Sequence, residues 1–435
     1  MKKLLIICQY FLPENKIGAI RPSKLAKYLA QSGNYKVTVV AAKPYGVDCP
    51  EYEVTADGVE IYRVNMGKLA SFLHYKKAGK GTSTNTASTE TANSPKKCGL
   101  KCLVIEWLFH FRMLLEKNAM LRNAKSILRD NKKEFDVIFS TYNTEFGHIV
   151  ARWYKKHHKN VKWIADFRDS VWLTNSTTKQ IKKAKKFAKR VATNCDLITA
   201  VSQGIFETHN TDFGARDRKI IFNGYDSEDI PTVTPKNDGI LRMAYTGELY
   251  SGQRDLTPVF KALSKLADDG KIDLSKIQIV YAGKGGSIFL SQIAPFSNIP
   301  FVNKGFISRN EALQLQLESD ILLLASWCYK GDKHTLTGKF FEYLGMNKPI
   351  LSVIAGEETG CILTEMINGE KLGYCYEEAT AEIGFEKLCA YIEEQYKCFE
   401  ENGSVAHSPN KEFVEGFEYR NIAKEIDVTI TKILK

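Results

Sequence analysis

The sequence predicts an α/β protein made of two doubly wound domains, on three observations. Short apolar runs, which are typical of buried parallel strands, alternate with stretches of helical periodicity. The alternation occurs twice, over residues 1–229 and 239–409, and each block begins with a strand of its own. Residues 226–239 are acidic, contain Pro231 and show no periodicity, so we interpret them as an interdomain linker.

The elements follow in order along both blocks. Apolar runs at 3–8 and 35–41 predict strands, and the helix predicted between them at 22–30 completes a βαβ unit. The first block continues with strands at 136–140, 162–165, 196–201 and 219–222 and a helix at 147–157. The second block has strands at 241–246, 277–282, 320–324 and 349–353 and helices at 256–266, 309–318 and 340–344. In open parallel sheets, ligands bind beyond the carboxyl ends of the strands, so the loops there are candidates for the site.

Two segments depart from this alternation. Residues 79–97 are polar and of low complexity, which predicts a mobile loop within the first domain. Residues 100–115 are rich in apolar and aromatic side chains, but they are too short and too charged to span a bilayer. They predict either a core helix or an amphipathic helix that lies on a membrane surface.

The excess charge is confined to one region. The chain carries 61 Lys and Arg and 50 Asp and Glu, a net charge of +11. Residues 152–190 hold 13 of the basic residues and two acidic ones, so they account for the whole excess. Within them, Ala184, Ala188 and Val191 mark one apolar helical face, and the other faces are basic. This pattern predicts either a solvated helix or a surface that docks on anionic phospholipid. No nucleic-acid partner is expected, because aromatic side chains are not interleaved and no such motif occurs.

Cysteine usage and the first residues bear on location. The ten cysteines form no Cys-x-x-Cys pair, which predicts buried, reduced thiols in the cytoplasm. Residues 1–12 imitate a signal peptide, but Pro13 and Glu14 follow without a small-residue cleavage site, so no signal peptide is expected. Uninterrupted apolar runs of roughly 18 residues are missing, which disfavours a transmembrane helix. We expect a cytoplasmic protein, peripheral at the inner face of the plasma membrane.

The strand-end loops carry glycines and cations. Neither G-x-G-x-x-G nor G-x-x-x-x-G-K-[ST] occurs, so neither a dinucleotide fingerprint nor a P-loop is supported. Gly18 would let the backbone approach a ligand at a helix start, although a plain flexible connection explains it equally well. In the second domain, Gly247 and Gly283 follow strands, and Arg254 could hold a diphosphate.

Residues 338–342 carry the most specific chemistry. Gly338 and Lys339 fall in the first turn of a predicted helix, and Glu342 lies one turn further. Gly338 presents bare backbone, Lys339 presents a positive charge, and Glu342 can accept hydrogen bonds from a ribose diol. A helix start with these groups suits a nucleoside diphosphate.

Five motifs in this order resemble retaining glycosyltransferase family 4, most closely its bacterial branch that builds capsule, O-antigen and exopolysaccharide repeat units. The motifs are DFRDSVW at 166–172, TAVS at 199–202, NGYD at 223–226, YTG at 245–247 and GKFFEYL at 338–344. The resemblance runs from Leu4 to about Pro349.

This resemblance implies a GT-B fold and a metal-independent reaction without a cofactor. Two Rossmann-like domains would face each other across a cleft, with the acceptor bound by residues 1–229 and the nucleotide sugar by residues 239–409. Residues 410–435 would form a C-terminal helix that packs back on the first domain.

The resemblance also assigns roles to single residues. Catalytic roles fall to Lys339, Arg254, Asp169 and Arg168. Donor binding falls to Gly18, Gly247, Gly283, Phe306, Ile307, Gly338 and Glu342. Asp166 and Arg21 are assigned to the sugar and acceptor side. A strand-end Asp also commonly caps the next helix, and Arg168 could merely pair with one, so structural roles stay open for these side chains.

Two positions depart from the family pattern. His334 stands where the family often has the first of two glutamates, which contacts the hydroxyls of the donor sugar. Glu248 stands where many relatives have Arg, which leaves Arg254 as the nearby basic candidate.

The resemblance, taken together with these residues, implies a retaining glycosyltransferase. It would move a sugar, for instance an N-acetylated hexosamine, from a UDP-linked donor to a lipid-linked or growing saccharide acceptor. Catalysis would chiefly require stabilising the leaving diphosphate. The alternatives are a nucleotide-sugar 2-epimerase of the same architecture and a non-catalytic two-domain sugar-binding protein.

Overall fold

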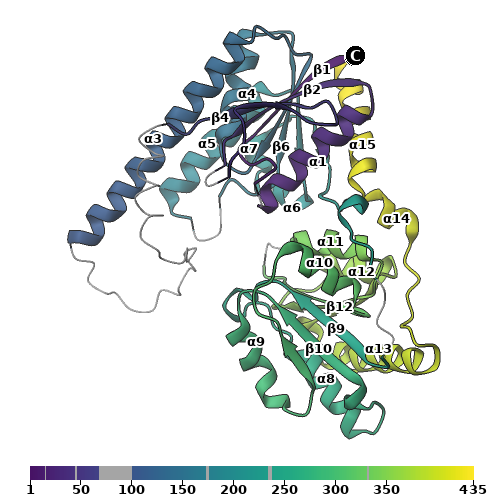
Figure 1. The fold of residues 1–435 in the computed structure, drawn as a ribbon. Helices are drawn as coiled ribbons and strands as arrows, with labels where there is room; N and C mark the ends of the chain where they lie inside the picture. The colour runs from purple at the N-terminus through teal and green to yellow at the C-terminus, as the bar shows by residue number, and fades with distance from the viewer. Residues whose placement is uncertain (15, 45–46, 68–99, 173–175, 234–237, 331–332) are drawn as a thin grey trace. The chain divides into compact units, whose positions relative to one another are not determined.

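The structure, a computed structural model, describes residues 1–435 except 15, 45–46, 68–99, 173–175, 234–237 and 331–332. The predicted mobile loop at 79–97 lies outside the described residues. The chain forms two compact units, coloured along the sequence in Figure 1. Unit 1 comprises Met1–Val201, His209–Lys219 and Ile426–Lys435, and unit 2 comprises Ser202–Thr208 and Ile220–Glu425.

Unit 1 contains an eight-stranded sheet of order β3-β4-β2-β1-β5-β6-β7-β8. The strands are β1 (Lys2–Cys8), β2 (Tyr35–Ala42), β3 (Tyr52–Val54), β4 (Glu60–Val64), β5 (Val137–Tyr142), β6 (Lys162–Phe167), β7 (Leu197–Ala200) and β8 (Arg218–Ile220). Strand β1 pairs in parallel with β2 and β5, and Leu4 to Ile7 are fully buried, as expected for a central parallel strand. Strand order reverses at β1 and β5, so the loops after these strands meet at one edge.

Two helices of unit 1 differ from the predicted bounds. Helix α1 (Ile17–Gln31) begins five residues before the predicted 22, because Pro22 lies inside the helix and not at its first position. Helix α3 (Leu100–Asp130) continues beyond the predicted 115, because Met120, Ala124 and Leu128 form a buried stripe at four-residue spacing. The remaining helices are α4 (Phe146–His157), α5 (Thr178–Asn194) and α7 (Asn210–Phe213).

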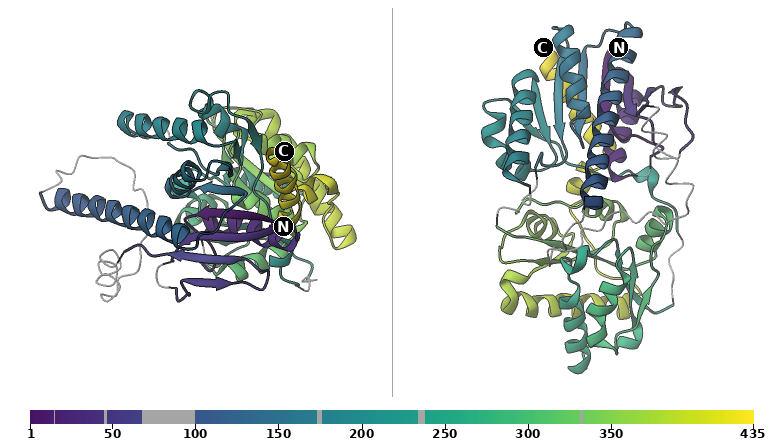
Figure 2. Two further views of the ribbon diagram at one scale, coloured as in Figure 1. Left: turned by 90° about the horizontal axis from the view of Figure 1, so that it is seen from above. Right: turned by 90° about the vertical axis from the view of Figure 1, so that its left-hand side faces the viewer.

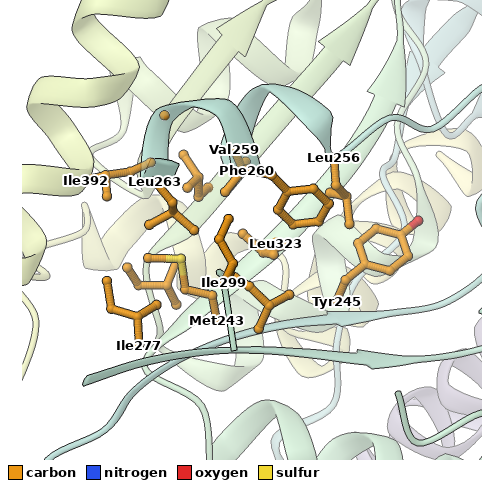
Figure 3. Close-up of a cluster of buried hydrophobic side chains, with 14 of the residues drawn as sticks. Met243, Tyr245, Leu256, Val259, Phe260, Leu263, Ile277, Ile299, Leu323 and Ile392 are labelled. Atoms are coloured by element: carbon orange, nitrogen blue, oxygen red, sulfur yellow. The ribbon is translucent and has the colours of Figure 1, made fainter. Parts of the chain in front are cut away.

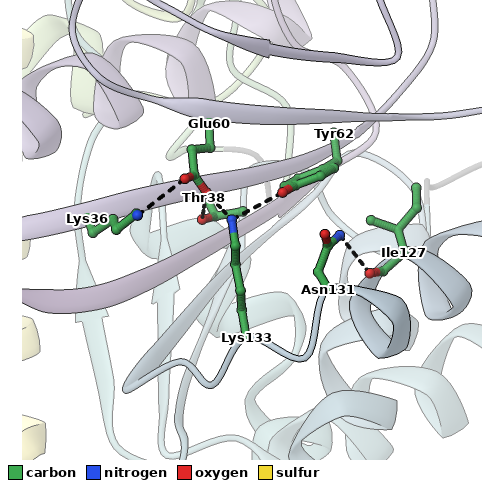
Figure 4. Close-up of polar contacts among 7 residues, drawn as sticks. All are labelled: Lys36, Thr38, Glu60, Tyr62, Ile127, Asn131 and Lys133. Atoms are coloured by element: carbon green, nitrogen blue, oxygen red, sulfur yellow. Dashed lines mark hydrogen bonds and ion pairs between the residues drawn. The ribbon is translucent and has the colours of Figure 1, made fainter.

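A polar network ties the segment after α3 to strand β4, as Figure 4 shows. Lys133 Nζ donates to the Glu60 carboxylate and to Tyr62 Oη, the latter at 3.1 Å. Glu60 also accepts from Thr38 Oγ1 at 3.1 Å and pairs with Lys36 at 3.4 Å. Burial opposes ionisation of Glu60, but the hydrogen bond and charge of Lys133 outweigh it and lower the pKa of this carboxyl.

Unit 2 contains a six-stranded parallel sheet of order β11-β10-β9-β12-β13-β14, the strand order of dinucleotide-binding folds. Its strands are β9 (Leu241–Thr246), β10 (Ile277–Ala282), β11 (Phe301–Asn303), β12 (Ile321–Trp327), β13 (Ile350–Ala355) and β14 (Gly373–Glu377). Its helices are α6 (Gln203–Thr208), α8 (Thr257–Asp268), α9 (Gly286–Ile293), α10 (Arg309–Leu317), α11 (Gly338–Met346), α12 (Ile362–Gly369), α13 (Ala381–Asn402) and α14 (Lys411–Gly416).

The core of unit 2 forms where helix α8 packs on the sheet (Figure 3). Val259, Phe260 and Leu263 are fully buried and lie over Met243 and Leu323 from the neighbouring strands β9 and β12. This packing fixes β9 and β12 side by side, and the loops that follow them carry much of the candidate site.

The C-terminal segment forms two helices where one was predicted. Helix α14 ends at Gly416, and α15 (Tyr419–Leu434) follows. The interruption occurs because Tyr225 inserts its backbone: its N–H donates to Phe417 O at 3.0 Å, and its carbonyl accepts from Tyr419 N–H at 2.9 Å.

The second half of α15 belongs to unit 1, so the C-terminal helix returns to the first domain as predicted. Asp427 accepts hydrogen bonds from Tyr35 Oη at 2.5 Å and from Asn34 Nδ2 at 2.9 Å. Lys2 Nζ donates to Thr431 Oγ1 at 3.2 Å, and the two termini lie near each other (Figure 2).

Candidate functional site

In unit 2 the strand order reverses between β9 and β12, and the loop after β9 begins at Gly247. Gly247 has a φ of 143°, which few other residues adopt, and its N–H donates to Ala282 O at 2.7 Å. A Cβ at this position would lie 2.3 Å from Cε of Lys339. Glycine therefore lets the lysine side chain cross the loop, and two residues singled out by the sequence meet there.

Helix α11 begins beside this loop with an ordinary N-cap. The Thr337 hydroxyl accepts from Phe340 N–H at 3.4 Å, and Gly338 is the first helical residue and is exposed. First-turn amides of a helix lack intrahelical acceptors and carry the positive end of its dipole. The start of α11 therefore favours an anion.

Lys339 adds a charge to this helix start. Its Nζ lies 3.4 Å from Thr246 Oγ1 at the end of β9. Burial lowers the pKa of Lys339; Glu342 acts to raise it, and the positive charges of Arg254 and Arg309 lower it further. Three cations thus act on one another here, which makes the site complementary to a multiply charged anion.

Glu342 follows Lys339 by one helical turn and is held by an amide. The fully buried Gln316 donates from Nε2 to Glu342 Oε1 at 2.7 Å and to Thr246 Oγ1 at 2.8 Å. The other carboxylate oxygen lies 3.9 Å from an Arg309 nitrogen, and 22% of the side chain is exposed. The carboxylate is thus oriented and still accessible as an acceptor.

Arg254 lies between β9 and α8, in the segment that begins at Gly247, and is 8% exposed. Its Nη1 donates to Glu248 O at 3.2 Å, and its guanidinium carbon lies 4.4 Å from the ring centre of Tyr250 and 5.4 Å from that of Trp327. Its Nε is buried without a hydrogen-bond partner among the described residues.

The glycine at the end of β10 also serves close packing. A Cβ on Gly283 would lie 1.9 Å from Gly247 O, so these two loops touch through their backbones. Beyond it, Phe306 is 73% exposed, and Lys284 Nζ lies 4.9 Å from its ring centre. Ile307 is half-buried against a small apolar cluster. The exposed Phe306 ring is available for stacking.

In unit 1 the predicted residues gather after β1, β5 and β6. Arg168 Nη1 donates to Gly18 O at 2.6 Å. In a regular helix this carbonyl would accept from the N–H four residues on, but that residue is Pro22, which has none. The proline inside α1 thus frees the carbonyl that fixes Arg168.

Asn143, at the end of β5, joins the same cluster. A Cβ on Gly18 would lie 2.6 Å from Asn143 Oδ1, so helix α1 approaches this side chain closely and a larger residue would displace it. Asn143 Nδ2 is 3.4 Å from Asp169 Oδ2, and Asp169 is exposed. Asn143 Oδ1 and Arg168 Nε are buried and have no partner among the described residues.

Asp166 and Arg21, assigned to the sugar and acceptor side, are 0% and 1% exposed and bind each other. Arg21 donates from Nε and Nη2 to the two Asp166 oxygens at 3.1 and 2.9 Å. Thr141 and Thr199 also donate to Asp166, at 3.0 and 2.8 Å. In this structure the pair braces the strand ends beneath Arg168 and presents no exposed group to a ligand.

The two departures from the family pattern differ in setting. His334 is half-buried before α11, with Nε2 3.1 Å from Glu207 Oε1 and a partnerless buried Nδ1. Glu248 is exposed, and its backbone carbonyl, not its side chain, contacts Arg254. Within the described ranges, no group of three His, Cys, Asp or Glu side chains gathers as a metal site would require.

Helix α3 contains the segment for which a core helix and an interfacial helix were both predicted, α5 contains the predicted basic helix, and α4 packs against both (Figure 2). Leu108, Phe111 and Leu114 of α3, spaced three apart, are each about half exposed. Helix α5 buries Ala184, Ala188 and Val191 and exposes its lysines, as its periodicity predicted. No described helix is long and apolar enough to cross a membrane.

Several side chains of these clusters were not found in the sequence. These side chains are Asn143, Gln316, Arg309, Tyr250 and Trp327. Asn143 and Gln316 are distant in sequence from the residues they contact, whereas Tyr250 lies four residues from Arg254 and Arg309 two residues from Ile307. Trp327 ends strand β12 directly at the switch point, so the rule that ligands bind beyond strand ends could have singled it out. Single polar residues inside helices, such as Gln316, carry no comparable signal.

No sequence-family model matches the chain, and no curated protein sequence matches it. Solved structures do match its backbone. The N-terminal domain of a trehalose-6-phosphate phosphatase from Candida albicans aligns with a TM-score of 0.64 at 10% identity, over 100% of this chain and 97% of that one. The apo lipopolysaccharide outer core galactosyltransferase WaaB aligns with a TM-score of 0.55 at 13% identity, over 99% of both chains.

A third match is described as trehalose-6-phosphate from E. coli bound with UDP-2-fluoro glucose. It aligns with a TM-score of 0.58 at 10% identity, over 99% of both chains. The chain has the GT-B fold. At these identities the likeness establishes the fold, and the activity must be argued from the side chains.

Proposed function

We propose that this GT-B protein is a retaining glycosyltransferase that uses a nucleoside diphosphate sugar. One observation carries the proposal: Lys339 and the start of α11 meet the loop after β9 at the switch point of unit 2, with Arg254 and Glu342 beside them. The cations and helix amides suit a diphosphate, and Glu342 suits a ribose diol. A galactosyltransferase and a protein bound to a UDP-sugar analogue share the fold, which supports a UDP-linked donor.

The proposed reaction breaks the bond between the anomeric carbon and the diphosphate oxygen, and the bonding electrons leave with the nucleoside diphosphate. An acceptor hydroxyl attacks from the same face and gives its proton to the leaving phosphate, so the anomeric configuration is kept. Lys339, Arg254 and the helix amides stabilise the charge that grows on the diphosphate. No step in this scheme requires a metal ion.

The acceptor-side assignments follow from the cluster in unit 1. Asp169 is exposed beside Asn143 and can contact the transferred sugar or the acceptor hydroxyl. Arg168 is fixed by the Gly18 carbonyl, and Gly18 lets α1 approach this point. The buried Asp166–Arg21 pair holds the strand ends that carry them.

For the acceptor, we propose a lipid-linked or growing saccharide at an anionic membrane surface, in the synthesis of a surface polysaccharide. The exposed apolar residues of α3 and the lysines of α5 support this assignment, since insertion and charge attraction act together at such surfaces. The protein would then be cytoplasmic and peripheral to the inner face of the plasma membrane.

The test is a panel of nucleotide sugars, each incubated with the purified protein with and without membrane lipid extract. We expect acceptor-dependent release of nucleoside diphosphate, and Lys339→Ala should reduce it about 10²- to 10³-fold, as for loss of one well-placed charge donor. Lys261→Ala, an exposed lysine of α8, is the matched control and should leave release unchanged. Acceptor-free epimerisation, or binding without turnover, would replace this proposal with the epimerase or the sugar-binding protein.

A further inference from the structure

Arg254 is a buried cation that lacks an anionic partner in the described chain. It is 8% exposed, and no Asp or Glu among the described residues forms an ion pair with it. Its Nη1 donates to a backbone carbonyl, Glu248 O, the guanidinium also hydrogen-bonds the Tyr245 hydroxyl, and its buried Nε has no partner among the described residues. Burying a guanidinium is costly unless its charge is compensated, so this position favours an anion.

Two aromatic rings surround the guanidinium in place of a carboxylate. Tyr250 and Trp327 have ring centres 4.4 and 5.4 Å from its central carbon, and the two rings lie 6.1 Å apart at 80°. They come from different elements, the loop after β9 and the end of β12. Ring faces attract a cation and cannot accept its N–H groups in the way that an anion does.

The backbone is strained so that Tyr250 can reach this position. Tyr250 and Ser251 have φ values of 45° and 54°, a conformation that residues with a Cβ rarely adopt, and Gly252 follows at 89°. Three backbone bonds close the turn: Gly252 and Arg254 N–H both donate to Leu249 O, and Gln253 N–H donates to Tyr250 O. Strain of this kind concentrates where a side chain must be aimed.

The backbone of Arg254 is also fastened from a third element. Gln292 of α9 donates from Nε2 to Arg254 O at 3.0 Å, and its Oε1 accepts from Leu256 N–H at 3.3 Å. The Arg254 side chain is therefore held at its backbone by Gln292 and at its guanidinium by the two rings.

We propose that Tyr250 and Trp327 are positioning residues that hold Arg254 ready for the diphosphate of the donor. This inference rests on the proposed function, and it assigns the placement of one phosphate-binding cation to an aromatic pair. Because the ring faces do not take up the N–H groups of the guanidinium as a carboxylate would, these groups stay available for phosphate oxygens. The loop then presents Arg254 and, through Gly247, the Lys339 side chain to the same anion.

The first test removes the Tyr250 ring without adding backbone strain. Tyr250→Gly suits a φ of 45°, and it should lower kcat about tenfold, the size of a well-placed cation–π contact. Tyr250→Phe keeps the ring and should retain wild-type kcat. Tyr329→Ala is the matched control, since Tyr329 is a similarly exposed tyrosine after β12, and it should leave kcat unchanged.

A double-mutant cycle separates positioning from a general structural role. If Tyr250 acts through Arg254, then Tyr250→Gly should have no further effect on kcat in the Arg254→Ala background. If the two losses multiply instead, the inference is overturned. Equal kcat for Tyr250→Gly and wild type would overturn it as well.

Trp327 supplies a readout that does not depend on turnover. It is the only tryptophan between residues 220 and 425, so subtracting the fluorescence of Trp327→Phe from that of wild type isolates its emission. Titration with UDP should change this signal, and Arg254→Ala should abolish the change. If wild type neither responds to nucleoside diphosphates nor turns over any donor, the proposed function fails and this inference falls with it. If the protein turns over a donor but the losses in kcat from Tyr250→Gly and Arg254→Ala multiply, this inference is overturned and the proposed function stands.

Discussion

At the scale of single residues, Pro22 shows how a missing donor can shape a distant contact. Its place inside α1 leaves the Gly18 carbonyl without the usual helical N–H donor. Arg168, which directly follows strand β6, donates a hydrogen bond to that carbonyl instead. Pro22, whose sequence position suggests a helix start, thus leaves a carbonyl in α1 available to the loop that carries Arg168 and Asp169.

Replacing Pro22 by Ala should lower turnover severalfold. The new N–H would compete for Gly18 O, and Arg168 would lose its fixed orientation, while a regained helical hydrogen bond of about 1 kcal/mol limits any loss of stability. Steady-state kinetics and thermal unfolding measure the two effects. In an Arg168→Ala background the substitution should change turnover no further; an undiminished effect there would contradict the connection.

Gln316 permits a second residue-level prediction. Gln316→Leu removes the donor that orients Glu342, so we expect KM for the donor to rise about fivefold with little change in kcat, as for a contact made equally in ground and transition states. The affinity difference between UDP and its 2′,3′-dideoxy analogue should shrink in the variant, because it reports the Glu342–ribose contact. Ser291→Leu serves as control: Ser291 is exposed on α9, and its hydroxyl donates to Ile288 O of the same helix at 2.7 Å.

At the scale of elements, His148 attaches helix α4 to the first sheet and makes that attachment sensitive to pH. Trp163 Nε1 donates to Ser140 Oγ at 2.7 Å, and Ser140 Oγ lies at hydrogen-bond distance, 2.8 Å, from His148 Nδ1. The imidazole is fully buried, which disfavours its charged form. Burial lowers its pKa from 6.5 to about 3, against a smaller opposing effect of Asp166.

The sign of the pH dependence follows from this lowered pKa. The unfolded state, with an ordinary pKa of 6.5, binds the proton more readily than the folded state. The contribution of His148 is therefore complete above that value and should fall by up to about 1.4 kcal/mol per pH unit towards pH 3. Urea unfolding of wild type and His148→Phe from pH 7.5 to 4 tests this, since the variant should be less stable at neutral pH but lose less on acidification. Parallel curves would refute the assignment.

How far the sequence predicts an element depends on how it is buried. Strands β9 and β10 begin and end at the predicted residues, because central parallel strands are continuous apolar runs. Strands β3, β4, β11 and β14 were not predicted; β3 and β11 have three largely exposed residues each, whereas β4 and β14 have five residues that are partly or fully buried. The predicted start of α1 was wrong because proline is common in the first turn of a helix. The contact of Arg168 with the Gly18 carbonyl, which compensates for Pro22 inside the helix, cannot be seen in the sequence.

The candidate site divides in the same way. Lys339 and Glu342 share one helical turn and a recognisable motif, so sequence alone could propose them. Gln316, which orients Glu342, and Tyr250, which contacts Arg254, lie outside this helix, and their roles depend on contacts made in the fold. The burial of Asp166 against Arg21 was equally invisible, because both residues are charged and each alone suits an exposed site.

At the scale of the whole molecule, we expect binding to anionic vesicles that requires both surfaces of unit 1. Leu108→Ser with Phe111→Ser should reduce binding to phosphatidylglycerol vesicles at all salt concentrations, because it removes insertion. Charge reversal at Lys182 and Lys186 should abolish the salt-sensitive part, at about 1 kcal/mol per lysine. Neutral phosphatidylcholine vesicles are the control in a sedimentation assay. Binding by wild type that ignores both salt and lipid charge would contradict the proposal.

Each unit is built from segments that lie far apart in the sequence, and this affects folding during synthesis. Phe417 packs against Phe341 in the core of unit 2, while Ile426 and Ile430 are buried in unit 1. Neither core is therefore complete until residues 417–430 have left the ribosome, although most of unit 1 is synthesised far earlier. Vectorial folding of this protein should pause with both cores open, and chaperone occupancy of the nascent chain should persist until residues 417–430 have left the ribosome.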